Sequence, residues 1–308
     1  MTIILNKLKK NMILIILIVT FIIILCKSKL VINSVLEATN IYFNNVFPCM
    51  FIFYTLGDLL INYNIYKIFN TIFGKLLSKI FNLNSNELLL MFLSMLLGFP
   101  SGSKYICYFL EKGYIDYNSA NKLLYVTHFS NPIFILGTVS ILTNTKIAIL
   151  VFISHYSANI MLVLMMKKGC IKQKNIFYTN EKKDLIEVLN ESFFSTLKII
   201  IIVLFYTIIF ITLSNLINLL YKNEFTNLIV FMLLDITNGI IAISNMNFSI
   251  FLNGLLISIL LTFGGINIHF QVKSIIKSKK LQYSSFLKGR IIATFITAML
   301  YIILFMII

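Results

Sequence analysis

Four short segments of this 308-residue chain carry the side chains that could bind a polar ligand. Each segment interrupts an apolar run with glycine, proline, hydroxyl, amide or charged residues. A lysine with hydroxyl and amide donors can hold a carboxylate, and an acid within a membrane can hold a proton or a cation. The segments are GFPSGSK at 98–104, FSNP at 129–132, DITNG at 235–239 and FGG at 263–265, which His269 and Gln271 follow.

An enzyme is the weaker interpretation of these residues. Ser101 lies in a turn similar to the nucleophile turn of a serine hydrolase, and His155 could serve as its base in an intramembrane protease, but position 99 is Phe where the motif has Gly. The three histidines have no ligand spacing, and no HExxH motif is present. We therefore expect no catalytic residue, no metal centre and no resident cofactor.

The composition predicts a membrane protein. Hydrophobic residues make up 59% of the chain and charged residues 12%, about half the charged share of a soluble protein. The 26 Lys and Arg residues exceed the 11 Asp and Glu residues, and they cluster between apolar runs. Cytoplasmic loops and anionic lipid headgroups explain that pattern better than nucleic acid does.

Seven segments are predicted to cross the membrane, because a helix needs ~20 apolar residues to span the hydrocarbon. The first would be an uncleaved anchor. Residues 65–81 place apolar side chains on one helical face, which predicts a helix along the cytoplasmic interface. The predicted spans are 12–26, 38–61, 119–144, 146–166, 192–219, 248–271 and 291–308.

Two further apolar stretches are interrupted at 98–104 and 235–239, and each half is too short to cross. We predict that both form re-entrant helical hairpins. The spans 119–144 and 248–271 are also broken, at 130–132 and 263–265. Lipid cannot satisfy the backbone groups that such breaks expose, so the breaks should meet at a central polar site.

The two halves repeat one order: a hairpin, a broken span, and a basic loop or helix. We predict a single membrane domain, 1–308, whose halves are inverted repeats as in secondary transporters. A cytoplasmic N-terminus leaves most of the 26 basic residues inside, with Lys104 and Lys198 at membrane depth. The parts are the N-terminal spans and interfacial helix at 1–85, the first repeat at 86–166, a basic cytoplasmic loop at 167–187 and the second repeat at 188–308.

The half-helix that starts near Ser103 should aim its free N–H groups into the central site. Some residues also have a plainer interpretation. Lys104 could reach the membrane interface, Asp235 could sit at a wet hairpin tip, and Asp58 is expected at the interface. The predicted substrate-binding residues are Ser101, Gly102, Ser103, Lys104, Ser130, Asn131, Asp235, Thr237, Asn238, Gly264, Gly265, His269 and Gln271.

Two other histidines are expected to have structural roles. His128 adjoins the break in 119–144 and should bond a backbone carbonyl, and His155 should pack between helices.

The four segments, in this order, resemble those of sporulation integral membrane proteins of the YlbJ/SpoVV type. The resemblance covers nearly the whole chain. It implies a Gate domain of the nucleoside-recognition superfamily and a fold similar to concentrative nucleoside transporters. It also implies movement of dipicolinic acid across the outer forespore membrane toward the forespore. Two positions depart from the family pattern, with Asp235 in place of the usual Glu and Ser103 in place of Ala.

With this resemblance we expect Lys104 and the first hairpin to meet the dipicolinate dianion, and Asp235 to bind a coupling proton or cation. Expected partners are the anionic solute and membrane lipid, with no nucleic acid; the sequence leaves a homo-oligomer open. Localisation in the cell membrane is the alternative to the forespore membrane. Alternative functions are a non-transporting sporulation scaffold, a small-molecule sensor and a nucleoside carrier, which Phe99 and Tyr105 could serve by stacking.

Overall fold

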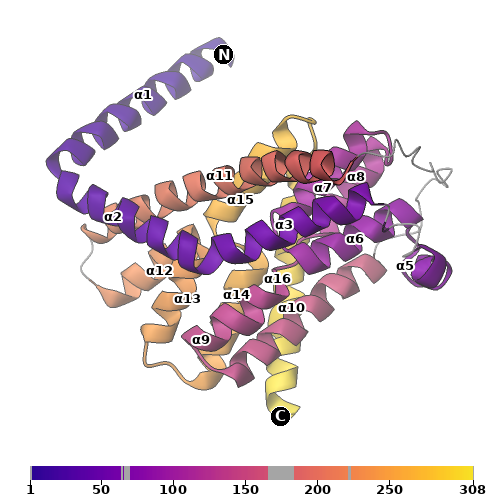
Figure 1. Ribbon diagram of the computed structural model, residues 1–308. Coiled ribbons are helices and arrows are strands. Elements are labelled where there is room, and N and C mark those ends of the chain that lie inside the picture. Colours follow the sequence, from indigo (N-terminus) through magenta and orange to yellow (C-terminus); the bar gives the residue numbers. More distant parts are fainter. Residues whose placement is uncertain (1, 64, 66–69, 166–183, 221–222, 308) are drawn as a thin grey trace.

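The computed structural model describes the chain apart from residues 1, 64, 66–69, 166–183, 221–222 and 308 (Figure 1). Every element within the described residues is helical, which confirms the all-α prediction. The predicted basic loop at 167–187 lies mostly outside the described residues, and only its last four residues are placed.

Four helical stretches are long and apolar enough to cross a bilayer, and they coincide with the last four predicted spans. A fifth candidate joins Leu17–Cys26 to Ser28–Val46 and is bent by 97°. The chain is therefore a multi-pass integral membrane protein, while the count of seven spans stays a prediction. The four stretches are α10 (Thr145–Met165), α11 (Leu185–Asn218), α14 with α15 (Ile250–Lys277) and α16 (Tyr283–Ile307).

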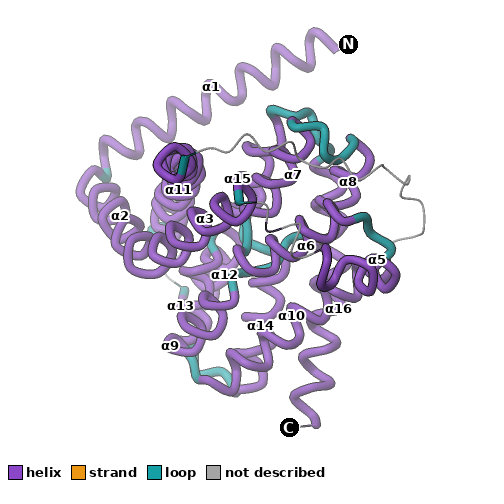
Figure 2. Tube along the Cα trace, turned by 45° about the vertical axis from the view of Figure 1, so that its right-hand side comes forward, coloured by secondary structure: helices purple, strands orange, loops and turns teal. Residues whose placement is uncertain are grey.

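The N-terminal helix α1 projects away from the rest of the molecule (Figures 1 and 2), and its side chains described beyond residue 10 are exposed or half-exposed. After a turn at Lys27 the chain is helical from 28 to 62. Pro48 has no N–H to donate, and a π-helical turn that ends two residues before it changes the backbone pairing there. The elements are α1 (Thr2–Cys26), α2 (Ser28–Ile41), η1 (Tyr42–Val46) and α3 (Phe47–Asn62).

The predicted interfacial helix at 65–81 is described from residue 70 onward, as the π-helical turn η2 (Asn70–Gly74) and α5 (Lys75–Phe81). Three large apolar side chains on it follow helical spacing and are more than half exposed. Such a stripe suits a helix that rests on the membrane interface. These side chains are Ile72, Leu76 and Ile80.

The order of elements repeats along the chain. In each half a long helical stretch leads to a helix–break–helix unit, then a broken helix, then an unbroken one. In the first half these are α2–α3, α6 (Ser85–Leu97) with α7 (Ser101–Glu111), α8 (Tyr117–Val126) with η3 (Phe134–Val139) and α9 (Ser140–Leu142), and α10. In the second they are α11, α12 (Glu224–Leu234) with α13 (Ile236–Asn245), α14 (Ile250–Phe263) with α15 (Ile266–Lys277), and α16.

Corresponding helices of the two halves run antiparallel where they pack. On α2, η1 and α11, Asn215 Nδ2 donates to Ser34 Oγ at 3.1 Å, and Tyr42 Oη donates to the Ile200 carbonyl at 2.9 Å. On α10 and α16, Asn159 pairs with Arg290 at one end and Lys146 lies over the Phe305 ring at the other. Antiparallel placement of equivalent elements is what inverted repeats require.

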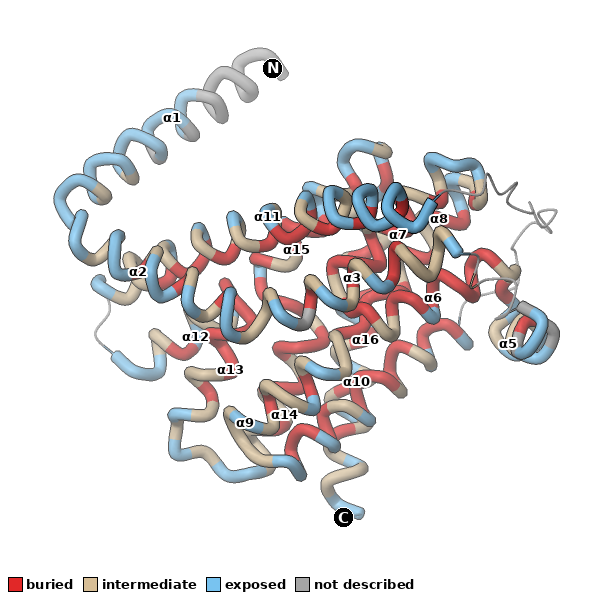
Figure 3. The backbone as a smooth tube through the Cα atoms, in the orientation of Figure 1, coloured by how far each residue is buried: buried red, intermediate tan, exposed pale blue. Residues whose placement is uncertain are grey.

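Both helix–break–helix units fold back on themselves. The open ends of α6 and α7 meet where Asn86 Nδ2 donates to the Tyr114 carbonyl at 2.8 Å. In the second unit Gly239 lies so close to α12 that a Cβ there would be 3.0 Å from Met232 Cα. Buried residues concentrate where these units meet the broken helices (Figure 3).

Gly289 brings α16 into contact with α8, because a Cβ at this position would overlap the Tyr125 carbonyl oxygen. That oxygen belongs to the main chain and cannot swing aside. We expect Gly289→Ala to destabilise the protein by about 1–3 kcal/mol, the usual cost of overpacking. Thermal unfolding of the detergent-solubilised protein measures this.

Gly137→Ala is the matched control, since its Cβ would meet only Ile133, at 3.8 Å. Its unfolding midpoint should stay at the wild-type value. Equal midpoints for the two variants would contradict the close contact at Gly289.

Candidate functional site

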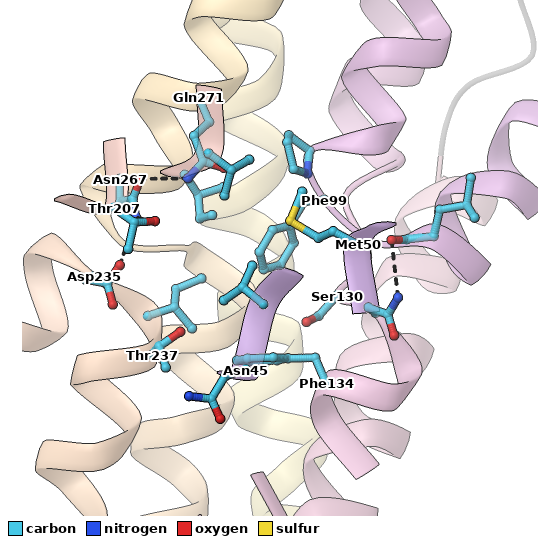
Figure 4. A pocket seen from close by; sticks show the side chains of 17 residues that line it. Asn45, Met50, Phe99, Ser130, Phe134, Thr207, Asp235, Thr237, Asn267 and Gln271 are labelled. Carbon is cyan, nitrogen blue, oxygen red and sulfur yellow. Dashed lines mark hydrogen bonds between the residues drawn. The ribbon is translucent and has the colours of Figure 1, made fainter. Parts of the chain in front are cut away.

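The four breaks in helical geometry meet around one cavity of about 70 Å³ (Figure 4). Residues at or near every break line this central cavity, and η1, α3 and α11 contribute the remaining wall. The space can hold several water molecules. Its polar lining consists of Asn45, Ser130 and Asn131 from the first half and Thr207, Asp235, Thr237, Asn267 and Gln271 from the second.

Glycines let the breaks of each half touch. Gly98 has φ +74°, and a Cβ on it would lie 2.5 Å from the Asn131 backbone nitrogen, so the first hairpin packs directly on the broken helix beside it. In the second half a Cβ on Gly265 would lie 3.1 Å from the Asp235 nitrogen. Gly264 has φ +81°, a conformation that glycine adopts freely. Each hairpin break therefore rests on the neighbouring break.

Helix α10 satisfies the backbone at Ser130. The Ser130 N–H donates to His155 Nε2 at 2.9 Å, and the Tyr156 hydroxyl lies 2.9 Å from the Ser130 carbonyl oxygen. The Ser130 hydroxyl itself is buried and has no partner among the described residues. Since Ser130 lines the cavity, this hydroxyl is available to a ligand.

Asp235 anchors a polar chain on the opposite wall (Figure 4). One carboxylate oxygen accepts from the Asn238 N–H at 2.9 Å and caps α13, and the other accepts from Asn267 Nδ2 at 2.8 Å. Asn267 Oδ1 in turn accepts from Gln271 Nε2 at 2.7 Å, which leaves Gln271 Oε1 buried without a partner among the described residues. No basic side chain within the described part of the chain pairs with Asp235.

The structure brings together five of the thirteen predicted site residues, and three more support the site from behind. Gly264, Gly265 and Asn238 shape or bond the second-half breaks without lining the cavity. The five that line it are Ser130, Asn131, Asp235, Thr237 and Gln271.

The first hairpin contributes less to the cavity than predicted. The Ser101 hydroxyl donates to the Gly98 carbonyl, Gly102 packs against the Thr127 carbonyl, and the buried Ser103 hydroxyl has no partner among the described residues. Instead, the part of this hairpin that lines the cavity consists of Leu97, Phe99 and Pro100. Ser101 bonds within the hairpin, Gly102 contacts the broken helix, and Lys104 reaches Asp58 on α3, so none of the three lines the central cavity.

Lys104 lies outside the central cavity and is paired with Asp58. Its Nζ is 2.8 and 2.9 Å from the two Asp58 carboxylate oxygens, and the Tyr105 hydroxyl donates to the same carboxylate at 2.8 Å. Asp58 is only 8% exposed, so its carboxylate is enclosed by protein, while its expected place at the membrane interface stays a prediction. Burial of either charge alone would cost several kcal/mol, and the attraction between the two charges offsets part of that cost.

The histidines have different roles. His155 lies between α10 and the breaks, as predicted, and its Nδ1 is 2.9 Å from the Thr262 hydroxyl. The prediction for His128 is wrong, because neither ring nitrogen has a partner among the described residues and the ring packs edge-on against Phe286. His269 does not line the cavity; its Nε2 donates to the Phe263 carbonyl at 3.1 Å and its Nδ1 accepts from Tyr283.

Arg290 holds both broken helices. From the sequence, Arg290 is expected in a basic loop that precedes the span 291–308, but it lies inside α16 and is 2% exposed. Its Nη1 donates to the His128 carbonyl at 2.9 Å and to the Thr262 carbonyl at 3.4 Å, and its Nη2 donates to Asn159 Oδ1 at 2.9 Å. Arg290 thus satisfies carbonyls at a break in each half.

Two of the missed residues left a signal in the sequence. Arg290 is the single arginine of a chain that otherwise uses lysine, and its planar guanidinium offers five donors that can serve acceptors on different segments. Asn267 lies four residues before Gln271, so both share one helical face. Thr207 and Asn45 left none, because they sit in unbroken helical stretches.

The chain is similar to the sporulation integral membrane protein YlbJ of Bacillus subtilis (strain 168). It is 23% identical to that protein over 288 residues, which cover 80% of this chain and 71% of the relative. No family model and no solved structure matches the chain. The chain is thus a distant relative of a sporulation membrane protein, in agreement with its apolar helices.

Replacement of Arg290 should remove its hydrogen bonds to the two broken helices. Arg290→Lys keeps the charge, but one ammonium cannot reach both carbonyls and Asn159. Each lost bond to a charged group costs roughly 1.5–3 kcal/mol, so we expect a clearly lower unfolding midpoint in detergent. Lys288→Gln, at an exposed side chain two residues earlier, should unfold like the wild type. Unchanged stability of Arg290→Lys would refute the bracing role.

Proposed function

We propose that this protein carries a small anionic solute, dipicolinate, across a membrane of a sporulating bacterium, and that the central cavity is its binding site. The observation that carries the proposal is the meeting of four helix breaks around one cavity with unpaired polar atoms. A scaffold of packed helices needs no such breaks. Non-helical backbone deep in a membrane protein is typical of sites through which polar solutes pass.

Two helix N-termini favour an anion at this site. Pro100 directly precedes α7 and Asn267 lies in the first turn of α15, and both residues line the cavity. The N-terminus of a helix carries a partial positive charge and free N–H groups, which together attract carboxylates. The Ser130 hydroxyl can donate one further hydrogen bond.

The Asp235 carboxylate is unfavourable for an anion and must be neutralised before one binds. A carboxylate in the same cavity repels a dianion unless it takes up a proton or a metal cation. We propose that Asp235 binds the coupling proton or cation, so that solute and coupling ion enter together. The re-entrant course of both hairpins, the Gate-domain fold and the outer forespore membrane as location belong to this proposal. The distant YlbJ relative supports the sporulation context.

A non-transporting role in the sporulation membrane is the second candidate. The exposed apolar length of α1, which stands apart from the helical body, favours it, because such a helix could contact another membrane protein. A protein that binds dipicolinate but never moves it across a bilayer would support this candidate. Competition by uridine would instead favour a nucleoside carrier, since Phe99 and Phe134 line the cavity and could stack on a base.

Uptake of radiolabelled dipicolinate into proteoliposomes tests the proposal, with and without a proton gradient or Na⁺ gradient. Asp235→Asn keeps the size of the side chain and removes its charge. We expect it to lower uptake by about tenfold or more and to abolish the response to the gradient, because intramembrane acids of this kind carry the coupling ion.

The control is Glu224→Gln, an exposed acid at the start of the same hairpin. It should transport at the wild-type rate. Equal gradient-driven uptake by Asp235→Asn and the wild type would remove Asp235 from the mechanism, and no uptake by any protein would refute the carrier function.

A further inference from the structure

A second cavity, of about 750 Å³, lies between α3, α7, α11 and α15; we refer to it as the vestibule. Figures 1 and 2 place these four helices together, and α11 packs against α3 and α15 while α15 packs against α7. The outer part of the vestibule carries exposed charged side chains, including Glu111, Lys112 and Lys198. Hydrocarbon would not tolerate so many charges, so this part faces water.

The vestibule and the central cavity share their walls. On α11, Val203 lines the central cavity and Ile199 lines the vestibule; on α15, Gln271 and Ile275 divide in the same way. Each pair is four residues apart, which is about one helical turn, or ~6 Å. The two cavities are therefore adjacent compartments along α11 and α15.

The Asp58–Lys104 ion pair lines the end of the vestibule nearest the central cavity, because Pro100 lines the central cavity about one helical turn before Lys104, and Met50 lines it about two turns before Asp58. Lys104 Nζ lies 4.9 Å from the centre of the Tyr105 ring and 5.6 Å from that of Tyr54. Both tyrosines are at most 1% exposed. Lys104 is thus the innermost cation that a solute in the vestibule would meet before the central cavity.

One buried hydroxyl group in the vestibule lacks a partner among the described residues. The Ser192 hydroxyl on α11 is buried, 1% exposed, lines the vestibule and has no hydrogen-bond partner among the described residues. Together with Lys104 it offers a donor and a cation, which is the chemistry that recognises a carboxylate.

We propose that the vestibule is a separate binding site for a dicarboxylate on its way to the central cavity, in which a solute carboxylate replaces Asp58 as the partner of Lys104. The proposal rests on the proposed carrier function and adds to it a first binding site, which the solute occupies before it reaches the central cavity. Because Asp58 presents the same functional group as the solute, it competes for Lys104 and keeps the pair closed when solute is absent. Solute binding then opens the partition between the two compartments.

Thiol protection tests this site without relying on transport. Ser195, which lines the vestibule, is changed to Cys in a full-length chain whose native cysteines are replaced by Ser. The rate of modification by a small anionic methanethiosulfonate is measured in detergent with and without dipicolinate. We expect dipicolinate to slow the reaction at least fivefold, and neutral uridine to leave it unchanged.

Substitutions at the Asp58–Lys104 ion pair then show whether the protection depends on Lys104. Asp58→Asn removes the competitor and should lower the dipicolinate concentration for half-protection about tenfold. The double variant Asp58→Asn/Lys104→Met removes both charges, leaves no unpaired one, and should lose protection. Lys79→Met, on exposed α5, should behave like the parent. Each variant is folded if its modification rate without dipicolinate and its gel-filtration profile equal those of the parent.

The outcomes separate this inference from the carrier function. Protection that survives in the double variant, or no protection in a protein that takes up dipicolinate normally, overturns the vestibule site alone. Protection that depends on Lys104 in a protein without uptake supports the site and refutes the carrier function. A Ser130→Ala variant, altered in the central cavity, should keep the protection.

Discussion

Every backbone N–H and C=O group that leaves a helix inside a bilayer must find another partner, and the structure is organised around that constraint. At Leu97 the carbonyl accepts from Asn131 Nδ2, at Ser130 the N–H donates to His155, and at Thr262 the carbonyl accepts from Arg290. The long helices α10 and α16 are positioned so that their polar side chains reach these groups. Two helices whose sequences are typical of simple membrane spans, α10 and α16, therefore also supply hydrogen-bond partners for the breaks.

The two halves share an order of elements but differ in charge. The second half brings the acid, Asp235, and the amides of Asn267 and Gln271, whereas the first brings the Ser130 hydroxyl and an apolar edge at Phe99. The cation of the first hairpin, Lys104, is directed to the vestibule instead. Similar architecture thus produces a cavity with one acidic wall and one nearly neutral wall, and a solute would bind in a preferred orientation.

Much of the arrangement could be predicted from the sequence, because a break in an apolar run is a local feature. The positions of all four breaks and the place of Asp235 beside one of them agree with the structure. Partners across the fold could not be predicted in this way. Asp58 and Lys104 are 46 residues apart, and nothing near either residue in the sequence predicts that they pair. The orientation of 101–104 also depends on how α7 lies against α3, which periodicity does not specify.

The glycine contacts have a mechanical consequence. Through Gly98 the first hairpin packs on its neighbouring broken helix, and through Gly265 the second packs likewise, so each pair forms one closely packed block. The central cavity lies between the blocks, and Arg290 bonds to a carbonyl in each. A rocking motion about that guanidinium would reshape the cavity while the main-chain contacts inside each block stay intact. Under the proposed carrier function, Arg290 would be the pivot of that motion.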